Sequence, residues 1–320
     1  MRFLHVLDTL EQTKSIPRIA GNIVNIMGGV MRTPETSLDS KLGKFDVVFL
    51  HTAIGAMRIA WRFRRSKIIH LYHGYPCSLK GLNIYGLRHH LNEMFMVKRY
   101  LHVVASSSFT AREYESRYGR KPKILHYGVN TNYYTPNGLA NNKYNFLYVG
   151  RLKQRKGVDM LLKSFKHVVN RHPSALLEIV GSGPEKEGLQ VLAKDLLIEQ
   201  NVLFSSNLSA DELLAKYRNC RVYVSASRWE GFGLPLLEAM SCGKPCVVSD
   251  IPSHKAIIEA SRVGVCVDPS DSEEFAENMI KIADESHTLV STARSYTLKH
   301  SWDNYVENLM VIVNEEGIKQ

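Results

Sequence analysis

The 320-residue sequence lacks an Asp-x-Asp motif, a Cys-x-x-Cys pair, internal repeats and any low-complexity tract. No segment approaches the run of about 20 apolar residues that spans a bilayer. The cysteine count is odd, and Cys242 and Cys246 sit four apart without a nearby histidine at the spacing of zinc ligands. We therefore expect reduced, mostly buried thiols instead of a disulfide framework or a zinc site. The five cysteines are Cys77, Cys220, Cys242, Cys246 and Cys266.

The N-terminal segment MRFLHVLD is too short for a secretory leader. Asp8 interrupts an apolar run that would need roughly 7–15 residues in an export signal. We expect this segment to form the first β-strand and the protein to be cytoplasmic.

Positive charge is concentrated in the first part of the chain. The formal net charge is +10, yet residues 1–138 hold 20 Lys+Arg against 8 Asp+Glu, and the remainder holds 21 against 23. Such asymmetry indicates that the first part meets something anionic. Nucleic acid, an anionic membrane surface and a phosphorylated acceptor are the candidates.

Short apolar runs alternate with amphipathic stretches along the chain, a pattern typical of parallel α/β sheets with helices on both faces. We predict strands at 3–7, 46–50, 67–73, 101–106, 123–127, 146–150, 176–181, 201–204, 222–227, 245–250 and 263–268. We predict helices at 85–99, 109–118, 156–169, 184–197, 209–218, 235–242, 271–283 and 303–315.

A segment rich in Asn, Gly and Pro, residues 135–143, is the expected domain boundary. It divides the chain into a first domain, 1–138, and a second, 139–300. With a length that suits about two domains, we predict two doubly wound, Rossmann-like domains facing across a cleft. Ligands of such folds bind beyond the carboxyl ends of the strands.

The stretch SASRWEGFGLPLLEAMSCGKPC (225–246) carries the strongest chemical signal. A strand runs into a glycine-containing loop, and Pro235 suits the first turn of the helix that follows. Free N–H groups at a helix start favour an anion such as a diphosphate. Glu230 in the loop and Glu238 one turn into the helix are carboxylates able to accept bonds from sugar hydroxyls.

A second signal lies in FLYVGRLKQRKGVDMLL (146–162). Gly150 ends a strand, Arg151 follows it, and Lys156 with Gly157 precedes a helix. An Arg fork and a Lys point charge beside a helix start suit a diphosphate.

These motifs, in this order and spacing, resemble the GT4 family of retaining glycosyltransferases over about residues 145–270. The resemblance implies the GT-B architecture, with a C-terminal helix (301–320) that packs back toward the first domain. It implies that Arg151 and Lys156 bind and stabilise the leaving diphosphate, that Glu238 holds the ribose, and that Glu230 contacts the transferred sugar. The implied donor-binding backbone positions are Gly150, Gly181, Gly183, Pro184, Gly231, Phe232, Gly233 and Leu234.

In the first domain the resemblance points to His73, in LYHGYP, as a residue close to the transferred sugar. The family's Gly-Gly loop after the first strand is missing. Gly21 is the candidate for the equivalent backbone position on the acceptor side.

The resemblance and the absence of Asp-x-Asp favour a metal-independent reaction without a cofactor, in which Arg151 and Lys156 replace the ion. Breaking a sugar–phosphate bond develops negative charge on the diphosphate, which preorganised cations stabilise. We hypothesise retention of configuration, with a donor phosphate oxygen taking the acceptor proton. The expected donor is a UDP- or GDP-linked hexose, and the expected acceptor is lipid-linked or saccharide, in surface polysaccharide synthesis.

Other functions stay open at this point. A non-catalytic nucleotide-sugar-binding subunit would retain the fold, and an epimerase or phosphorylase could share it. NAD binding is not favoured, because Lys186 stands where the third glycine of a dinucleotide motif should follow Gly181 and Gly183.

The basic segment MRIAWRFRRSK (57–67) would place Arg58, Arg62 and Arg65 on one helical face. It is either a solvated face over a packed helix or, with Arg64 and the interleaved aromatic residues, an interfacial membrane patch. No nucleic-acid-binding motif accompanies the charge. We therefore expect a protein peripheral to the inner face of the plasma membrane.

Binding of the protein to anionic vesicles should weaken as salt is added. The Debye length shrinks from about 10 Å at 0.1 M salt to about 3 Å at 1 M, which screens attraction between basic side chains and lipid headgroups. Co-sedimentation with anionic and with neutral vesicles measures this effect. Binding that is absent, or that does not respond to salt, would contradict the membrane interpretation.

Overall fold

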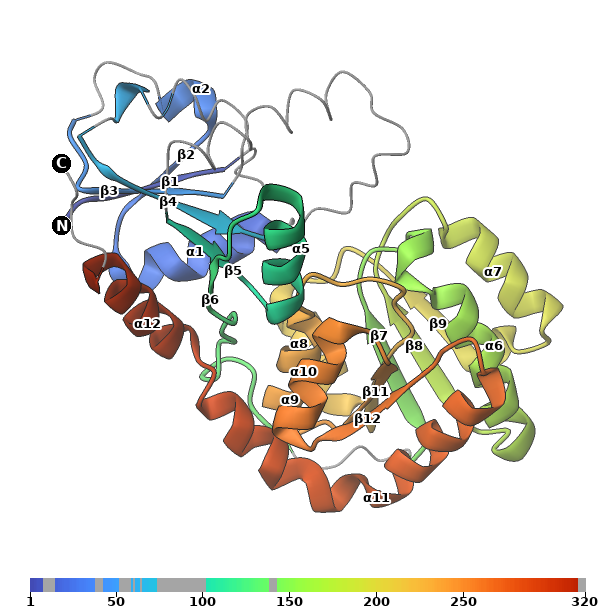
Figure 1. Cartoon of the computed structure of the whole chain (residues 1–320). Helices are drawn as coiled ribbons and strands as arrows, with labels where there is room; N and C mark the ends of the chain where they lie inside the picture. The colour runs from blue at the N-terminus through green and yellow to red at the C-terminus, as the bar shows by residue number, and fades with distance from the viewer. Residues whose placement is uncertain are drawn as a thin grey trace. The chain divides into compact units, whose positions relative to one another are not determined.

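The structure is a computed structural model that describes residues 1–7, 15–37, 43–51, 59, 61–63, 65–73, 102–137 and 143–315. The chain forms two compact units (Figure 1). One comprises Met1–Tyr127 together with Trp302–Gln320, and the other comprises Gly128–Ser301.

The first unit contains a sheet of parallel strands in the order β2-β1-β3-β4-β5-β6. Its strands are β1 (Phe3–Val6), β2 (Val30–Arg32), β3 (Val47–Leu50), β4 (Lys67–Tyr72), β5 (Val103–Ala105) and β6 (Lys123–Ile124). Its helices, within the described residues, are α1 (Ser15–Met27), α2 (Pro34–Ser37), α5 (Ser108–Tyr118) and α12 (Trp302–Glu315). The order places the topological switch point between β1 and β3.

The second unit contains a sheet of parallel strands in the order β12-β11-β10-β7-β8-β9. Its strands are β7 (Asn145–Val149), β8 (Leu176–Val180), β9 (Val202–Ser205), β10 (Val222–Ser225), β11 (Cys246–Ser249) and β12 (Gly264–Val267). Its α-helices are α6 (Val158–Arg171), α7 (Lys186–Asp195), α8 (Ala210–Asn219), α9 (Leu234–Ser241), α10 (Pro252–Ser261) and α11 (Ser272–Leu298), and its short 3-10 helices are η1 (Gln154–Lys156) and η2 (Glu199–Asn201). This is the strand order of the Rossmann fold, with its switch point between β7 and β10.

Continuous apolar runs make the central strands largely buried, as expected for parallel sheets covered on both faces. In the second unit Phe146 of β7, Leu177 of β8 and Val224 of β10 join one core with Phe165 of α6 and Phe275 of α11. A smaller core in the first unit forms around β1 and β3. The predicted α/β class with parallel sheets is confirmed.

Helix ends follow local sequence signals. Ser107 caps α5 in a capping box with Thr110, and Gly119 ends that helix in the left-handed conformation. Ser209 and Glu212 form a second capping box at the start of α8. These side chains satisfy backbone N–H groups that have no partner within the helix.

Residues 128–138, assigned to the first domain from the sequence, lie in the second unit. Arg294 of α11 holds them there, because its guanidinium donates to the carbonyl of Thr131 at 2.7 Å and of Tyr134 at 2.8 Å. Composition marked the boundary at the Asn-rich segment, but these hydrogen bonds tie the preceding residues to the second unit.

The last helix, α12, belongs to the first unit. It packs against α1, and Lys67 of β4 donates to the carbonyl of Val313. Lys123 pairs with Glu315 at 3.0 Å.

Several elements differ from the sequence prediction. Strand β2 and helices α1 and α10 were not predicted, and α11 continues 15 residues beyond the predicted end at 283, to Leu298. The predicted helix at 85–99 lies outside the described residues.

Among the described residues of the basic segment, the predicted helical face does not extend to Arg65. Trp61 and Arg62 are helical, but Arg65 lies in a turn, since the chain must reverse before β4 begins at Lys67. Trp61 is 72% exposed. Arg58 and Arg64 lie outside the described residues. None of the helices in the described ranges is long and apolar enough to cross a membrane.

Glycine is required where the loops after β7 and β8 meet. A Cβ on Gly181 would lie 1.8 Å from the carbonyl oxygen of Gly150, and one on Gly183 would lie 2.1 Å from that of Leu152. Backbone bonds join the same loops, from Gly150 to Val180 and from Leu152 to Ser182.

Gly181→Ala should lower the free energy of unfolding by about 1–3 kcal/mol or more, because the new methyl group collides with backbone that cannot move aside. Gly188→Ala is the matched control, since a Cβ at this exposed position in α7 meets nothing within 4 Å. The control should gain about 0.5–1 kcal/mol from reduced chain entropy. Urea denaturation without ligand measures both, and equal stability of the two variants would contradict the close approach.

Candidate active site

The loop after β7 turns sharply at Gly157, which ends η1 and begins α6 with φ of 62°. A Cβ on Gly157 would lie 1.9 Å from the carbonyl oxygen of Ala226, just after β10. Because β7 and β10 are neighbours at the switch point, this contact brings their two loops together at the carboxyl edge of the sheet.

The loop after β10 is fastened to the β7 loop by arginine side chains. Arg228 forms a two-pronged pair with Asp159 of α6 at 2.9 and 2.7 Å, and its backbone N–H donates to the carbonyl of Arg155 at 2.8 Å. Arg155 donates to the carbonyl of Trp229 at 3.0 Å and lies over its indole ring. Bidentate pairs fix orientation as well as distance.

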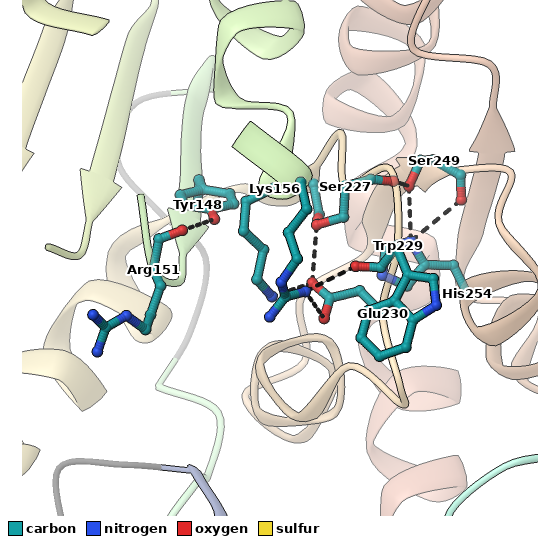
Figure 2. Close-up of polar contacts among 10 residues, drawn as sticks. Tyr148, Arg151, Lys156, Ser227, Trp229, Glu230, Ser249 and His254 are labelled. Atoms are coloured by element: carbon teal, nitrogen blue, oxygen red, sulfur yellow. Dashed lines mark hydrogen bonds and ion pairs between the residues drawn. The ribbon is translucent and has the colours of Figure 1, made fainter. Parts of the chain in front are cut away.

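The two loops present Lys156 and Glu230 to one another as an ion pair (Figure 2). Each side chain is only 12% exposed. Ser227 donates to the same carboxylate at 2.9 Å, and Arg155 lies 3.6 Å from it. Burial would raise the pKa of Glu230, but Lys156, His254 and Arg155 outweigh it and hold that pKa below its usual range. Glu230 is therefore a carboxylate at neutral pH.

Two polar residues near this pair, Ser249 and His254, were not predicted from the sequence. The Ser249 hydroxyl donates to the carbonyl of Ser227 at 2.6 Å, and His254 Nδ1 donates to the carbonyl of Ser249 at 3.2 Å. Burial lowers the pKa of His254 to about 4, so its ring is neutral at pH 7. The signal that could have found Ser249 is its place at the end of β11, next to β10.

Arg151 stands apart from this ion pair. Its side chain is exposed and points away from Lys156 and Glu230 in Figure 2. Within the part of the chain that the structure describes, it has no ion-pair partner. Its carbonyl accepts a bond from the Tyr148 hydroxyl at 3.3 Å. The guanidinium is thus available to an anion from solvent.

Glu238 is buried in α9 and accepts a bond from the Tyr217 hydroxyl at 2.8 Å. Burial, and then the neighbouring Glu238, raise the pKa of Tyr217 well above its usual value. The tyrosine therefore stays a donor and fixes one carboxylate oxygen of Glu238.

Helix α9 begins without a side-chain cap. Its N-cap is Gly233, with φ of 105°, and Pro235 occupies the first turn. Gly231 and the buried Phe232 precede it, and Leu234 is the first helical residue. Uncapped N–H groups at a helix start favour a bound anion.

The glycines of the loop after β8 have a structural role in the geometry. Gly181 and Gly183 allow the close approach to the β7 loop described above, and Pro184 follows them at the surface. Gly150 lies next to the hydroxyl of Tyr148, where a Cβ would come within 2.7 Å.

In the first unit His73 follows β4 and is bonded through both ring nitrogens. Nδ1 meets the hydroxyl of Tyr127, and Nε2 lies 3.0 Å from Nδ1 of His51. Gly21 lies inside α1 and not in a loop after β1, because residues 15–27 continue as one helix through it. Its N–H is therefore not exposed at a strand end, as the sequence analysis expected.

Among the described residues, no three His, Cys, Asp or Glu side chains are grouped so as to hold a metal ion.

Comparison with known proteins identifies two family regions. Residues 130–297 match the family described as glycosyl transferases group 1, and residues 28–133 match Glycosyltransferase Family 4. The first match alone covers more than half of the chain.

Relatives in several organisms match a large part of the chain. The D-inositol 3-phosphate glycosyltransferase of Acidothermus cellulolyticus is 27% identical over 236 residues, which cover 67% of this chain and 53% of that protein. The GDP-mannose-dependent alpha-(1-6)-phosphatidylinositol monomannoside mannosyltransferase of Mycolicibacterium smegmatis is 30% identical over 184 residues, covering 52% and 48%. The chain spans about half the length of the curated relatives it matches.

Solved structures share the fold across nearly the whole chain. Anabaena HepE in complex with UDP and glucose has a TM-score of 0.81 at 16% identity and covers 98% of this chain and 100% of that one. The lipopolysaccharide outer core galactosyltransferase WaaB has a TM-score of 0.73 at 18% identity, covering 99% and 100%. The predicted GT-B fold is confirmed, and the chain belongs to the glycosyl transferases group 1 family.

Proposed function

We propose that the chain is a retaining glycosyltransferase that moves a hexose-type sugar from a UDP- or GDP-linked donor to a lipid-linked or saccharide acceptor in surface polysaccharide synthesis. The observation that carries this proposal is the Lys156–Glu230 pair at the switch point of the second sheet. A largely buried cation and carboxylate beside an uncapped helix start suit a sugar diphosphate better than a neutral ligand.

Lys156 and Arg151 have complementary parts in this reaction. Lys156 is held by Glu230 within the fold, so its ammonium is preorganised at the strand edge. Arg151 is exposed and has no ion pair in the described part of the chain, so it can close on the diphosphate as a fork. Together they would stabilise the negative charge that develops on the leaving diphosphate without a metal ion or cofactor.

Glu230 and Glu238 would recognise hydroxyl groups of the donor. Glu230 is ionised and accepts bonds from the Ser227 hydroxyl and Lys156, which leaves lone pairs for the transferred sugar. Glu238 has one oxygen fixed by Tyr217, and its carboxylate would hold the ribose hydroxyls. The N–H groups around Phe232–Leu234 at the start of α9 would bind a phosphate oxygen, and the loop of Gly181–Pro184 would lie near the nucleotide.

An anionic acceptor is supported by charge and by the relatives. Residues 1–138 hold 20 Lys+Arg against 8 Asp+Glu. Two of the relatives are named for inositol 3-phosphate and for a phosphatidylinositol mannoside, which both carry phosphate. A phosphate-bearing, lipid-linked acceptor would place the enzyme at an anionic membrane surface, with the exposed Arg65 among the basic side chains that could face it.

The donor should stabilise the protein against heat. A panel of UDP-, GDP-, ADP- and CMP-sugars tests this, because a ligand at 100 times its Kd adds about 2.7 kcal/mol, or roughly 5–10 °C in Tm. One nucleotide should act selectively, and Lys156→Ala and Glu238→Ala should lose the shift relative to their own ligand-free Tm. Lys153→Ala, at an exposed position in the same loop, should keep it. If no donor stabilises the folded wild type, the proposed assignment of the donor-binding site is wrong.

Arg151→Ala should lower kcat at saturating donor by about 10²-fold or more, because the loss falls on charge that develops in the transition state. Steady-state transfer with the donor selected by the thermal shifts measures it, and Lys153→Ala again serves as the control. Unchanged turnover in Arg151→Ala would contradict its role at the leaving group.

A further inference from the structure

Three neighbouring strands of the first sheet each bring a histidine to their carboxyl end. His5 lies on β1, His51 follows β3, and His73 follows β4. His5 pairs in register with Phe49, and its ring stacks on that phenyl group at 4.8 Å. Because alternate residues of a strand share a face, His51 lies on the same side as Phe49. The histidines thus gather at the β1/β3 switch point.

The ring nitrogens form one unbranched line. His5 Nδ1 lies 3.1 Å from His51 Nε2, and His51 Nδ1 lies 3.0 Å from His73 Nε2. At one end of these three rings, His73 Nδ1 meets the hydroxyl of Tyr127. At the other end His5 Nε2 is buried without a hydrogen-bond partner in the described residues.

All three rings are neutral in the folded protein. Burial lowers the pKa of His5 and of His73 to about 3, and the pKa of His51 well below its usual value. His70 of β4 would add repulsion if it were charged. Burial raises the pKa of Tyr127, with Tyr305 of α12 acting in the same direction, so the phenol keeps its proton.

A neutral imidazole has one N–H and one bare nitrogen, so a line that uses both nitrogens of His51 and His73 can run in one direction only. Either every ring is the Nε2–H tautomer or every ring is the Nδ1–H tautomer. The first would leave His5 with a buried N–H that has no acceptor, and the second would leave it with a bare lone pair. Among main-chain groups, orphaned buried N–H donors are rarer than under-satisfied acceptors, and by the same argument the Nδ1–H direction is favoured here.

We propose that His51 is a positioning residue, which donates Nδ1–H to His73 Nε2 and thereby fixes the ring plane and the tautomer of His73. The proposal rests on the proposed function, since His73 is the first-unit residue expected near the transferred sugar. A neutral, fixed ring there would not repel the positive charge that develops at the anomeric carbon. His5 anchors the far side of His51, and Tyr127 anchors the far side of His73.

Two substitutions of His51 distinguish its hydrogen bond to His73 from its hydrogen bond to His5. The amide of Asn reaches about as far as Nδ1 of histidine, and the longer Gln reaches about as far as Nε2. His51→Asn can therefore keep the bond to His73, whereas His51→Gln can keep only the bond to His5. His51→Gln should lower kcat at least about tenfold with little change in donor KM, a loss of the size seen when a partner that orients a metal-bound histidine is removed. His51→Asn should stay close to wild type, and His102→Gln, outside the line, is the control.

Nitrogen-15 NMR of histidine-labelled protein tests the tautomer without donor or turnover, with the His73 signals assigned through His73→Gln. His73 should be the neutral Nδ1–H tautomer at pH 6–8 in the wild type and in His51→Asn, and a mixture of tautomers in His51→Gln. An Nε2–H or already mixed His73 in the wild type, or a His51→Gln variant with unchanged tautomer and kcat, overturns the proposal. Failure of the proposed function would show separately, as a wild type that no nucleotide sugar stabilises.

Discussion

The close contact between Gly157 and the carbonyl of Ala226 is the constraint on which the second unit's site depends. Because Gly157 has no side chain, the loops after β7 and β10 can touch. This contact brings Lys156 within reach of Glu230. The Arg228–Asp159 pair holds the contact from the solvent side. A methyl group at position 157 would separate the loops, and the charged pair would be lost with them.

The attraction between Lys156 and Glu230 offsets the free-energy cost of removing both charges from water. Each charge alone would be costly at 12% exposure, and removing one would leave the other uncompensated. The lowered pKa of Glu230 also sets a pH dependence. Its contribution to stability is present above the pKa of an unfolded glutamate, and it is lost as the pH falls through the lower folded value. The site is therefore in its charged form throughout the neutral range.

Sequence reasoning found the parts of the site that local chemistry specifies. Glu230, Lys156 and Glu238 stand in loops and helix starts whose glycine, proline and charge pattern has a direct physical meaning. It did not find His254 or Ser249, because their contact with the Glu230 loop depends on β11 lying beside β10, which is a tertiary fact. It also placed Gly21 in a loop, although α1 continues through it. A glycine in a helix interior is locally unfavourable, and only packing of the neighbouring Ile19 and Ile23 in the core overrides that preference.

The switch point of the second unit carries charged side chains, whereas that of the first unit carries neutral ones. The second carries a cation and a carboxylate, where the proposed reaction releases a negatively charged diphosphate, and the exposed side chain of Arg151 points away from that pair. The first carries a line of three imidazoles that burial keeps uncharged, so its high content of Lys and Arg does not extend into this part of the sheet. A developing positive charge at a sugar carbon tolerates neutral rings better than imidazolium ions. In each unit the rule of the switch point predicts where a ligand binds, and the side chains at the strand ends decide whether that point is charged or neutral.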